Sequence, residues 1–220
     1  MPVEAPVRSR LDRDRIVEAL LEIGIEGFSM HSLARRLGVS ATALYRHFES
    51  REALLAAAMD HFCARVARPT SEAWDIYLEE LAVNFRSALL EMPGAADYAS
   101  AIGPASEQAF ALVEGALAVL RGAGFAPREA WIAYVFVIHH TIHSVQRQER
   151  FEALNRQRGP KPYRVLELGS AERERFPSLA AALPALDLDF ERSFQTSLTF
   201  VIDGLRAEQR RQANRSPSKR

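Results

Sequence analysis

The chain has 220 residues, of which 48% are hydrophobic, and its 28 Lys and Arg balance its 28 Asp and Glu. This length and apolar content suffice for a globular protein, while the balanced charge excludes a global attraction to nucleic acid or to a membrane surface. Neither a membrane-spanning apolar run nor a secretory signal is visible, and the single cysteine excludes an internal disulfide. We therefore expect a cytoplasmic protein that meets any charged partner with a local patch.

Apolar residues recur at spacings of three and four along nearly the whole chain, which predicts an all-α fold. The first predicted helix spans residues 11–23. Ser29 can cap a short second helix over 30–37, and Gly38 supplies the left-handed residue that ends it. Ser40 can then cap a third helix over 41–48, and Ser50 a fourth that reaches Val66.

Longer helices follow Pro69. We predict them over 74–90, from Pro104 to 122, from Pro127 to 149, from Ser170 to 183 and from Asp189 to 208. The intervening segment 152–169 contains two prolines and two glycines and is predicted as a long loop. The pattern divides the chain into an N-terminal domain over 1–67, a larger C-terminal domain over 68–208 and a basic, disordered tail over 209–220.

The second and third predicted helices form a helix-turn-helix. Only three residues separate them, which leaves room for nothing but a tight turn. The apolar residues spaced to bury the seam between the two helices are Leu33, Leu37, Val39, Leu44 and Phe48. Residues 29–51 contain four Arg and one acid, so positive charge is concentrated where the neutral total conceals it. An ordinary helical hairpin with solvated charges is the alternative.

The outward face of the third helix fits a DNA-reading surface. It carries Ala41, Thr42, Ala43, Tyr45, Arg46 and His47. The small residues at its start allow close approach to base edges, and their methyl groups can meet thymine methyls. Arg46 is long enough for a guanine or a phosphate, and both options stay open. Tyr45 and His47 suit phosphate oxygens, which position a protein on DNA without reading sequence.

Residues 12–60 resemble the DNA-binding domain of the tetracycline-repressor (TetR) family of regulators. The resemblance is carried by "LGVSATALYRHFESREALL", which matches the family signature GVS-x-x-x-LY-x-HF from Gly38 to Phe48. The chain departs at Met30, where the family often has Thr, and at Arg51, where it usually has a Lys that contacts phosphate. The resemblance therefore implies DNA contacts from the reading face together with Ser29, His31, Ser40 and Arg51.

Residues 74–208 resemble, more weakly, the C-terminal domain of the tetracycline-binding branch. The resemblance implies a homodimer held together by the helix over 128–148 and by the last helix. The last helix carries a broad apolar stripe of Phe194, Leu198, Val201, Ile202 and Leu205, which fits such an interface. The alternative is that the stripe serves only the internal core.

Most of the branch's polar drug contacts are missing. Phe85 and His139 match, but Leu81, Ala116 and Ala99 stand where the branch has an Asn, a Gln and a metal-side His. Tetracycline is therefore not the expected ligand. We expect a more hydrophobic effector in a pocket lined by Leu81, Phe85, Tyr98, Phe110, Val113 and Trp131, with His139, His140 and His143 as polar contacts.

The run "HHTIH" also raises a metal or catalytic hypothesis. His139 and His143 share a helix face, but no Glu follows the first His as in zinc hydrolases, and no third ligand can be named. We expect no metal, no cofactor and no catalysis. Cys63 is interpreted as a small buried apolar residue, with a redox switch as the alternative. Arg8 and Arg10 could form an arm in the minor groove.

Together these features predict a ligand-responsive transcriptional repressor that binds a palindromic DNA operator as a homodimer and is released by a small hydrophobic effector. An activator of the same fold, a ligand-insensitive architectural DNA binder and a metal-dependent enzyme using His139 and His143 are the alternatives.

Overall fold

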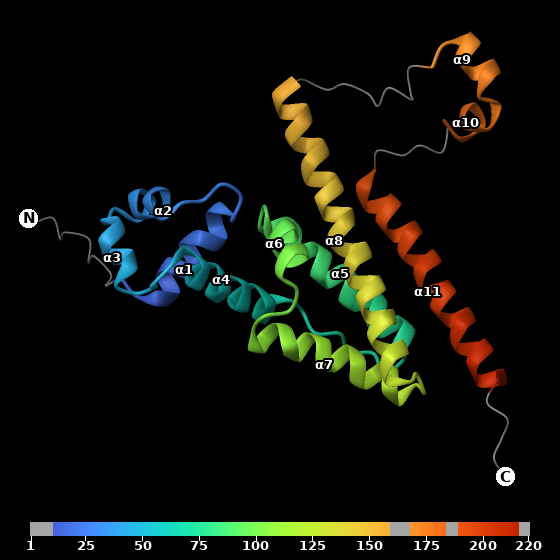
Figure 1. Ribbon diagram of the computed structural model, residues 1–220, viewed down its shortest axis with the longest axis horizontal. Coiled ribbons are helices and arrows are strands. Elements are labelled where there is room, and N and C mark those ends of the chain that lie inside the picture. The colour runs from blue at the N-terminus through green and yellow to red at the C-terminus, as the bar shows by residue number, and fades with distance from the viewer. Residues whose placement is uncertain (1–10, 159–167, 184–188, 216–220) are drawn as a thin grey trace, which may run out of the picture. The chain divides into compact units, whose positions relative to one another are not determined.

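The computed structural model describes residues 11–158, 168–183 and 189–215, and within these ranges it contains helices and turns but no strand (Figure 1). The predicted all-α fold is confirmed. The chain separates into two compact units, the first made by residues 1–68 and 87–115 and the second by 69–86 and 116–220. The predicted arm at Arg8 and Arg10 lies outside the described residues.

The first unit begins with four helices: α1 (Arg13–Ile23), α2 (Met30–Leu37), α3 (Ala41–Tyr45) and α4 (Arg51–Arg65). Helix α1 packs on α2 and α4, and α2 packs on α3. The side chains that meet between them are fully buried and apolar, so burial of these faces holds the four helices together. They include Ile16, Leu20, Leu33, Leu44 and Leu54, each 0% exposed.

The turn between α2 and α3 has the predicted geometry. Gly38 adopts the left-handed conformation (φ 68°, ψ 30°), and the Val39 N–H donates to the Ala34 carbonyl at 3.0 Å. Two details differ from the sequence analysis. Helix α3 ends at Tyr45 rather than Phe48, because the chain must become extended at Ser50 to cap α4. Leu37 and Val39 are half-buried, whereas the rest of the seam is buried.

The rest of the first unit comes from the end of α5, from α6 (Ala95–Ile102) and from the start of α7 (Glu107–Gly122). Helix α6 was not predicted, since no side-chain cap marks its start. Pro104 was expected in the first turn of a helix, but it lies in the turn between α6 and α7. Gly103 (φ 71°) ends α6 there, and Ser106 Oγ accepts from the Ala109 N–H at 3.3 Å to begin α7.

The second unit contains most of α5 (Trp74–Glu91), the end of α7, α8 (Pro127–Arg158), α9 (Ser170–Arg175), α10 (Pro177–Ala182) and α11 (Phe190–Arg215). Helix α8 runs into the predicted loop, so 152–158 is helical, and 159–167 lies outside the described residues. The single helix predicted over 170–183 is broken at Phe176, because a residue before proline is disfavoured in the helical conformation.

Helix α11 runs longer than predicted and packs against α8. Residues 209–215 of the predicted disordered tail are helical, and 216–220 lie outside the described residues. Within the apolar stripe, Phe194, Leu198 and Ile202 are 2%, 2% and 0% exposed inside this one chain. The internal-core alternative is therefore correct for these three residues, because α8 already covers them. None of the described helices is long and apolar enough to cross a membrane.

Candidate nucleic-acid interface and sensing region

The predicted reading face lies on and directly after α3. The Ser40 hydroxyl accepts a hydrogen bond from the Ala43 N–H at 3.2 Å and so fixes the start of the helix. Thr42, Tyr45 and Arg46 are exposed, Tyr45 by 48%. Ala41, Ala43 and His47 are half-buried, and Arg46 and His47 follow the last residue of α3. The face thus combines small residues at its start with longer polar side chains at its end.

The start of α2 is fixed by a pair of serines. The Ser32 N–H donates to Ser29 Oγ at 3.1 Å, and the Ser29 N–H donates to Ser32 Oγ at 2.9 Å. Ser32 thus takes the place that Glu or Gln holds in a standard capping box, which is why the sequence analysis missed it. Ser29 and the neighbouring His31 are both exposed, so their predicted phosphate contacts are sterically open.

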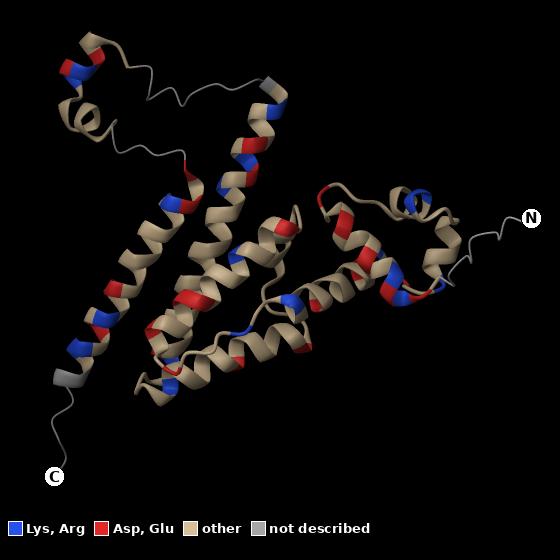
Figure 2. Ribbon diagram, turned by 180° about the vertical axis from the view of Figure 1, so that it is seen from behind, with Lys and Arg blue, Asp and Glu red and all other residues tan. Residues whose placement is uncertain are grey.

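The four helices α1 to α4 are called the head below. Two arginines of this head already have partners within the first unit. Arg51 Nε donates to the Phe28 carbonyl at 3.5 Å, and its guanidinium lies 4.9 Å from the centre of the Phe28 ring. Its terminal nitrogens remain available for a phosphate. Arg36 pairs with Glu22 at 3.2 Å. Figure 2 shows the blue basic segments of the head on α2 and near the first turn of α1, beside red acidic ones.

The predicted effector-binding residues are divided between the two units. Leu81, Phe85 and Trp131 belong to the second unit, where the first two are 1% and 8% exposed and Trp131 is 45% exposed. Tyr98, Phe110 and Val113 belong to the first, where Val113 is buried and Phe110 is 58% exposed. Their membership of one pocket stays a prediction.

The three histidines of α8 have different environments. His140 Nε2 lies 3.0 Å from Ser197 Oγ of α11, and the His140 ring stacks on Phe194 with 5.7 Å between centroids. Burial lowers the pKa of His140, a hydrogen bond with the Phe194 backbone opposes this, and His143 lowers the pKa further. The net shift is downward, so His140 is neutral at pH 7. His139 and His143 are exposed, and the described residues contain no cluster of three potential metal ligands.

Sequence reasoning missed a buried arginine in the second unit. Arg86 of α5 is 4% exposed, and it donates to Glu191 Oε2 at 2.6 Å and to Gln148 Oε1 at 2.8 Å. Its Nε has no hydrogen-bond partner among the described atoms. The available signal was its position one helical turn after Ala82 and two after Leu78, on the buried face of α5. Arg86 places a charged donor in the core of the second unit.

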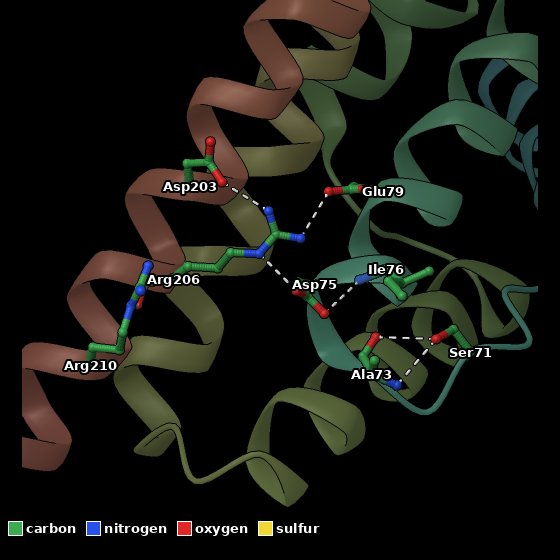
Figure 3. Close-up of polar contacts among 8 residues, drawn as sticks. All are labelled: Ser71, Ala73, Asp75, Ile76, Glu79, Asp203, Arg206 and Arg210. Carbon is green, nitrogen blue, oxygen red and sulfur yellow. Dashed lines mark hydrogen bonds and ion pairs between the residues drawn. The ribbon is translucent and has the colours of Figure 1, made fainter.

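A second arginine ties α11 to α5. Figure 3 shows Arg206 among three carboxylates, with Asp75 Oδ2 at 2.7 Å, Asp203 Oδ1 at 2.9 Å and Glu79 Oε1 at 3.4 Å. Burial pushes the pKa of Asp75 upward, but the hydrogen bond and charge of Arg206, together with backbone hydrogen bonds, outweigh it. The pKa of Asp75 therefore lies below its ordinary value, and the carboxylate is ionised at neutral pH.

Within the first unit, the segment 87–115 is hydrogen-bonded to the head formed by α1 to α4. The Pro93 carbonyl accepts from the N–H groups of Ile25 and Glu26 at 2.9 and 3.3 Å. Gly24 and Gly94 lie at this contact, and a Cβ on Gly94 would lie 2.8 Å from the Glu26 nitrogen. On α4, Asp60 Oδ1 accepts from the Gln108 N–H of α7 at 3.1 Å. Movement of α6 or α7 would thus reach the head directly.

Comparison with known proteins gives a consistent assignment. Residues 14–58 match the family "Bacterial regulatory proteins, tetR family", and residues 68–209 match "Tetracyclin repressor-like, C-terminal domain". The chain is 30% identical over 209 residues to the class D tetracycline repressor protein of Escherichia coli, covering 91% of each chain.

Solved structures agree. A possible TetR family transcriptional regulator from Streptomyces coelicolor A3(2) matches with a TM-score of 0.76 at 29% identity, covering 89% of this chain and 99% of that one. TetR-Q116A from Acinetobacter baumannii AYE, solved in complex with minocycline, matches with a TM-score of 0.67 at 27% identity, covering 96% and 98%. The helix-turn-helix and the helical C-terminal region are thus those of a transcriptional regulator rather than an enzyme, and the chain belongs to the TetR family.

Proposed function

We propose that this protein represses transcription by binding a palindromic operator as a homodimer, and that a small hydrophobic effector releases it. The observation that carries the proposal is the capped, small-residue start of α3 in a helix-turn-helix. Ala41, Thr42 and Ala43 leave the backbone of α3 able to approach base edges closely, which a bulkier start would prevent. Two-fold symmetry of a dimer then implies two-fold symmetry in the operator.

Arg46 is the only long cationic side chain among the proposed contacts of the reading face. It is exposed directly after α3. A bidentate contact from Arg46 to guanine would fix one base of each half-site. Tyr45, His47 and Arg51, with Ser29 and His31 of the α2 start, would contact phosphates and set the register of the head on the duplex. Methyl contacts and DNA shape would supply the remaining specificity.

Dimerisation is assigned to the exposed apolar residues of α8 and α11. The buried part of the α11 stripe cannot serve a partner, but Phe200 of α11 is 73% exposed. On α8, Ile132 and Phe136 are 50% and 60% exposed and share one helix face by their spacing of four residues. Exposed aromatic and aliphatic residues of this kind favour a protein interface. His139 and His143 continue the same face, which suits interface contacts.

Effector response requires the two states of the protein to bind the effector with different affinities. A 100-fold loss of operator binding corresponds to about 2.7 kcal/mol of coupling. The hydrogen bonds from Ile25 and Glu26 to Pro93, and from Gln108 to Asp60, support a route by which a shift of α6 and α7 reaches the reading head. The apolar Leu81 and Phe85 and the buried donor Arg86 favour an effector that is largely hydrophobic with one acceptor group.

The decisive experiment is selection from randomised duplex DNA at fixed moderate salt. We expect a palindrome whose half-site centres lie about 34–36 Å or a multiple apart along the duplex. Recovery of no palindrome would contradict the proposal. Arg46→Ala should then relax the preference at one base position of each half-site if Arg46 reads guanine. Equal weakening on all sequences would instead identify Arg46 as a phosphate contact.

A further inference from the structure

We propose that Arg13 of α1 is a positioning residue for operator recognition, holding the end of the reading segment without touching the DNA itself. The inference rests on the proposed function. Arg13 is the first residue of α1, and its Nη1 donates to the carbonyl of His47. Its guanidinium carbon lies 4.0 Å from the centre of the Phe48 ring. The Arg13 side chain therefore contacts two consecutive residues, His47 and Phe48, directly after Arg46.

The reading helix needs such support because it is short. Helix α3 has five residues, far fewer than an isolated helix needs to be stable in water. Ser40 caps its N-terminal end, but the last turn contains no basic residue to interact with the exposed carbonyl groups. The Leu44 carbonyl already accepts from the N–H groups of His47 and Phe48, at 2.9 and 3.0 Å. Arg13, from a different helix, adds a cation at the His47 carbonyl, two residues beyond the end of α3.

The same contact fixes the backbone of the residues that are proposed to bind DNA. Phe48 is 1% exposed, so its ring is a rigid anchor in the core of the head. Arg13 stacks on that ring and holds the His47 carbonyl, which restricts the backbone on which Arg46 and His47 are carried. A planar guanidinium can stack and donate a hydrogen bond in one geometry, whereas the Lys ammonium has no plane and reproduces the contact only in part.

The salt dependence of binding separates a positioning residue from a phosphate ligand. Loss of one phosphate contact lowers the slope of log K against log salt by about 0.9. Loss of a residue that only orients the DNA-contacting side chains weakens specific binding but leaves the slope unchanged. The test uses Arg13→Gln, Arg13→Lys and the control Arg65→Gln, which removes one charge from the exposed end of α4. The probe is the duplex selected by the wild-type protein, with a scrambled duplex of the same length.

We expect Arg13→Gln to weaken binding to the selected duplex about tenfold, the scale of a hydrogen bond to a charged group. Binding to the scrambled duplex and the salt slope should stay unchanged, Arg13→Lys should restore part of the loss, and Arg65→Gln should bind as the wild type does. A smaller slope in Arg13→Gln would make Arg13 a phosphate ligand and overturn the inference. Unchanged affinity for the selected duplex, with or without a lower melting temperature, would overturn it too.

Amide hydrogen exchange tests the same contact without DNA. In Arg13→Gln, we expect faster exchange at the amides of His47 and Phe48 and no change at Leu33 of α2. Equal exchange in variant and wild type would refute the proposal that Arg13 holds the segment after α3. If the wild-type protein selects no duplex, the proposed function fails, and the exchange result still decides whether Arg13 holds the end of α3. If the wild type selects a duplex that Arg13→Gln binds equally well, only the inference about Arg13 fails.

Discussion

Replacing Arg206 by Gln should remove one electrostatic link between α11 and α5, another being the Arg86–Glu191 ion pair. The side chain of Arg206 is 32% exposed and that of Asp75 is 24% exposed, and the two are joined by a hydrogen bond of 2.7 Å. This partly shielded, charge-assisted bond contributes about 1 to 2 kcal/mol. The bonds to Glu79 and Asp203, 39% and 60% exposed, add only about a few tenths of a kcal/mol each because solvent screens them.

We therefore expect Arg206→Gln to lower the free energy of unfolding by about 2 kcal/mol at pH 7. Arg210→Gln is the matched control, since Arg210 lies one turn further along α11, is exposed and, among the described residues, donates to the Arg206 carbonyl alone, at 3.2 Å. It should cost less than about 0.5 kcal/mol. The assay is urea unfolding at one protein concentration, because association of the chain would shift the midpoint.

The effect of Arg206→Gln should depend on pH in a defined direction. The pKa of Asp75 is lowered in the folded state, so its contribution is fully present above the unfolded value of about 3.9 and is lost as the pH falls through the lower folded value. The difference between wild type and variant should be constant from about pH 7 to 5 and shrink below about pH 4. A difference below about 0.5 kcal/mol at pH 7, or one that grows on acidification, would refute the reasoning.

Three further predictions concern other parts of the chain. Gly94→Ala should destabilise the protein and alter operator affinity more than Gly103→Ala, because both glycines have positive φ but only Gly94 faces backbone, with Glu26 N 2.8 Å from the added Cβ. Phe200→Asp should yield monomers in sedimentation velocity, whereas the same change at Leu179, 40% exposed on α10, should not. Burial, helped by the charge of Asp60 and opposed by that of Arg68, raises the pKa of Cys63 to about 11, so the native thiol should react slowly with a disulfide reagent at pH 8.

Each of these predictions has a contradicting result. Equal destabilisation by the two glycine substitutions would mean that the contact between Gly94 and Glu26 adds nothing to the cost of placing a side chain at positive φ. A Phe200→Asp protein that stays dimeric would remove Phe200 from the proposed interface. Modification of the native protein as fast as that of the unfolded chain would show that Cys63 is accessible. That result would favour the alternative that Cys63 is a redox switch.

The N-terminal head could be predicted closely because its structure depends on local signals. Ser29, Ser40 and Ser50 each cap a helix, and Gly38 adopts the left-handed conformation that ends α2. A hydroxyl that caps an N-terminus, and a glycine that tolerates positive φ, act on residues within one turn of their own position. The bounds of α2 were therefore predicted correctly, and α4 ends one residue before the predicted boundary.

Elements whose limits depend on distant contacts were predicted less well. Helix α8 continues past residue 151, where Phe151 meets Phe190 of α11 with 5.3 Å between ring centroids. Helix α6 has no side-chain cap, and its Ala95 and Ala96 are 0% exposed in the folded chain. Nothing in the local sequence of either segment encodes these partners.

By itself, the sequence determined the all-helical fold and the family and predicted the reading face on α3, since capping, periodicity and the GVS-x-x-x-LY-x-HF match are properties of neighbouring residues. Only the tertiary structure decided which face of α11 is buried, that Arg86 is a buried cation, and that Arg13 contacts His47, 34 positions away in the sequence, and the adjacent Phe48. Side-chain partners far apart in the chain are fixed by how helices pack, and packing follows from the complete set of buried surfaces rather than from any one segment.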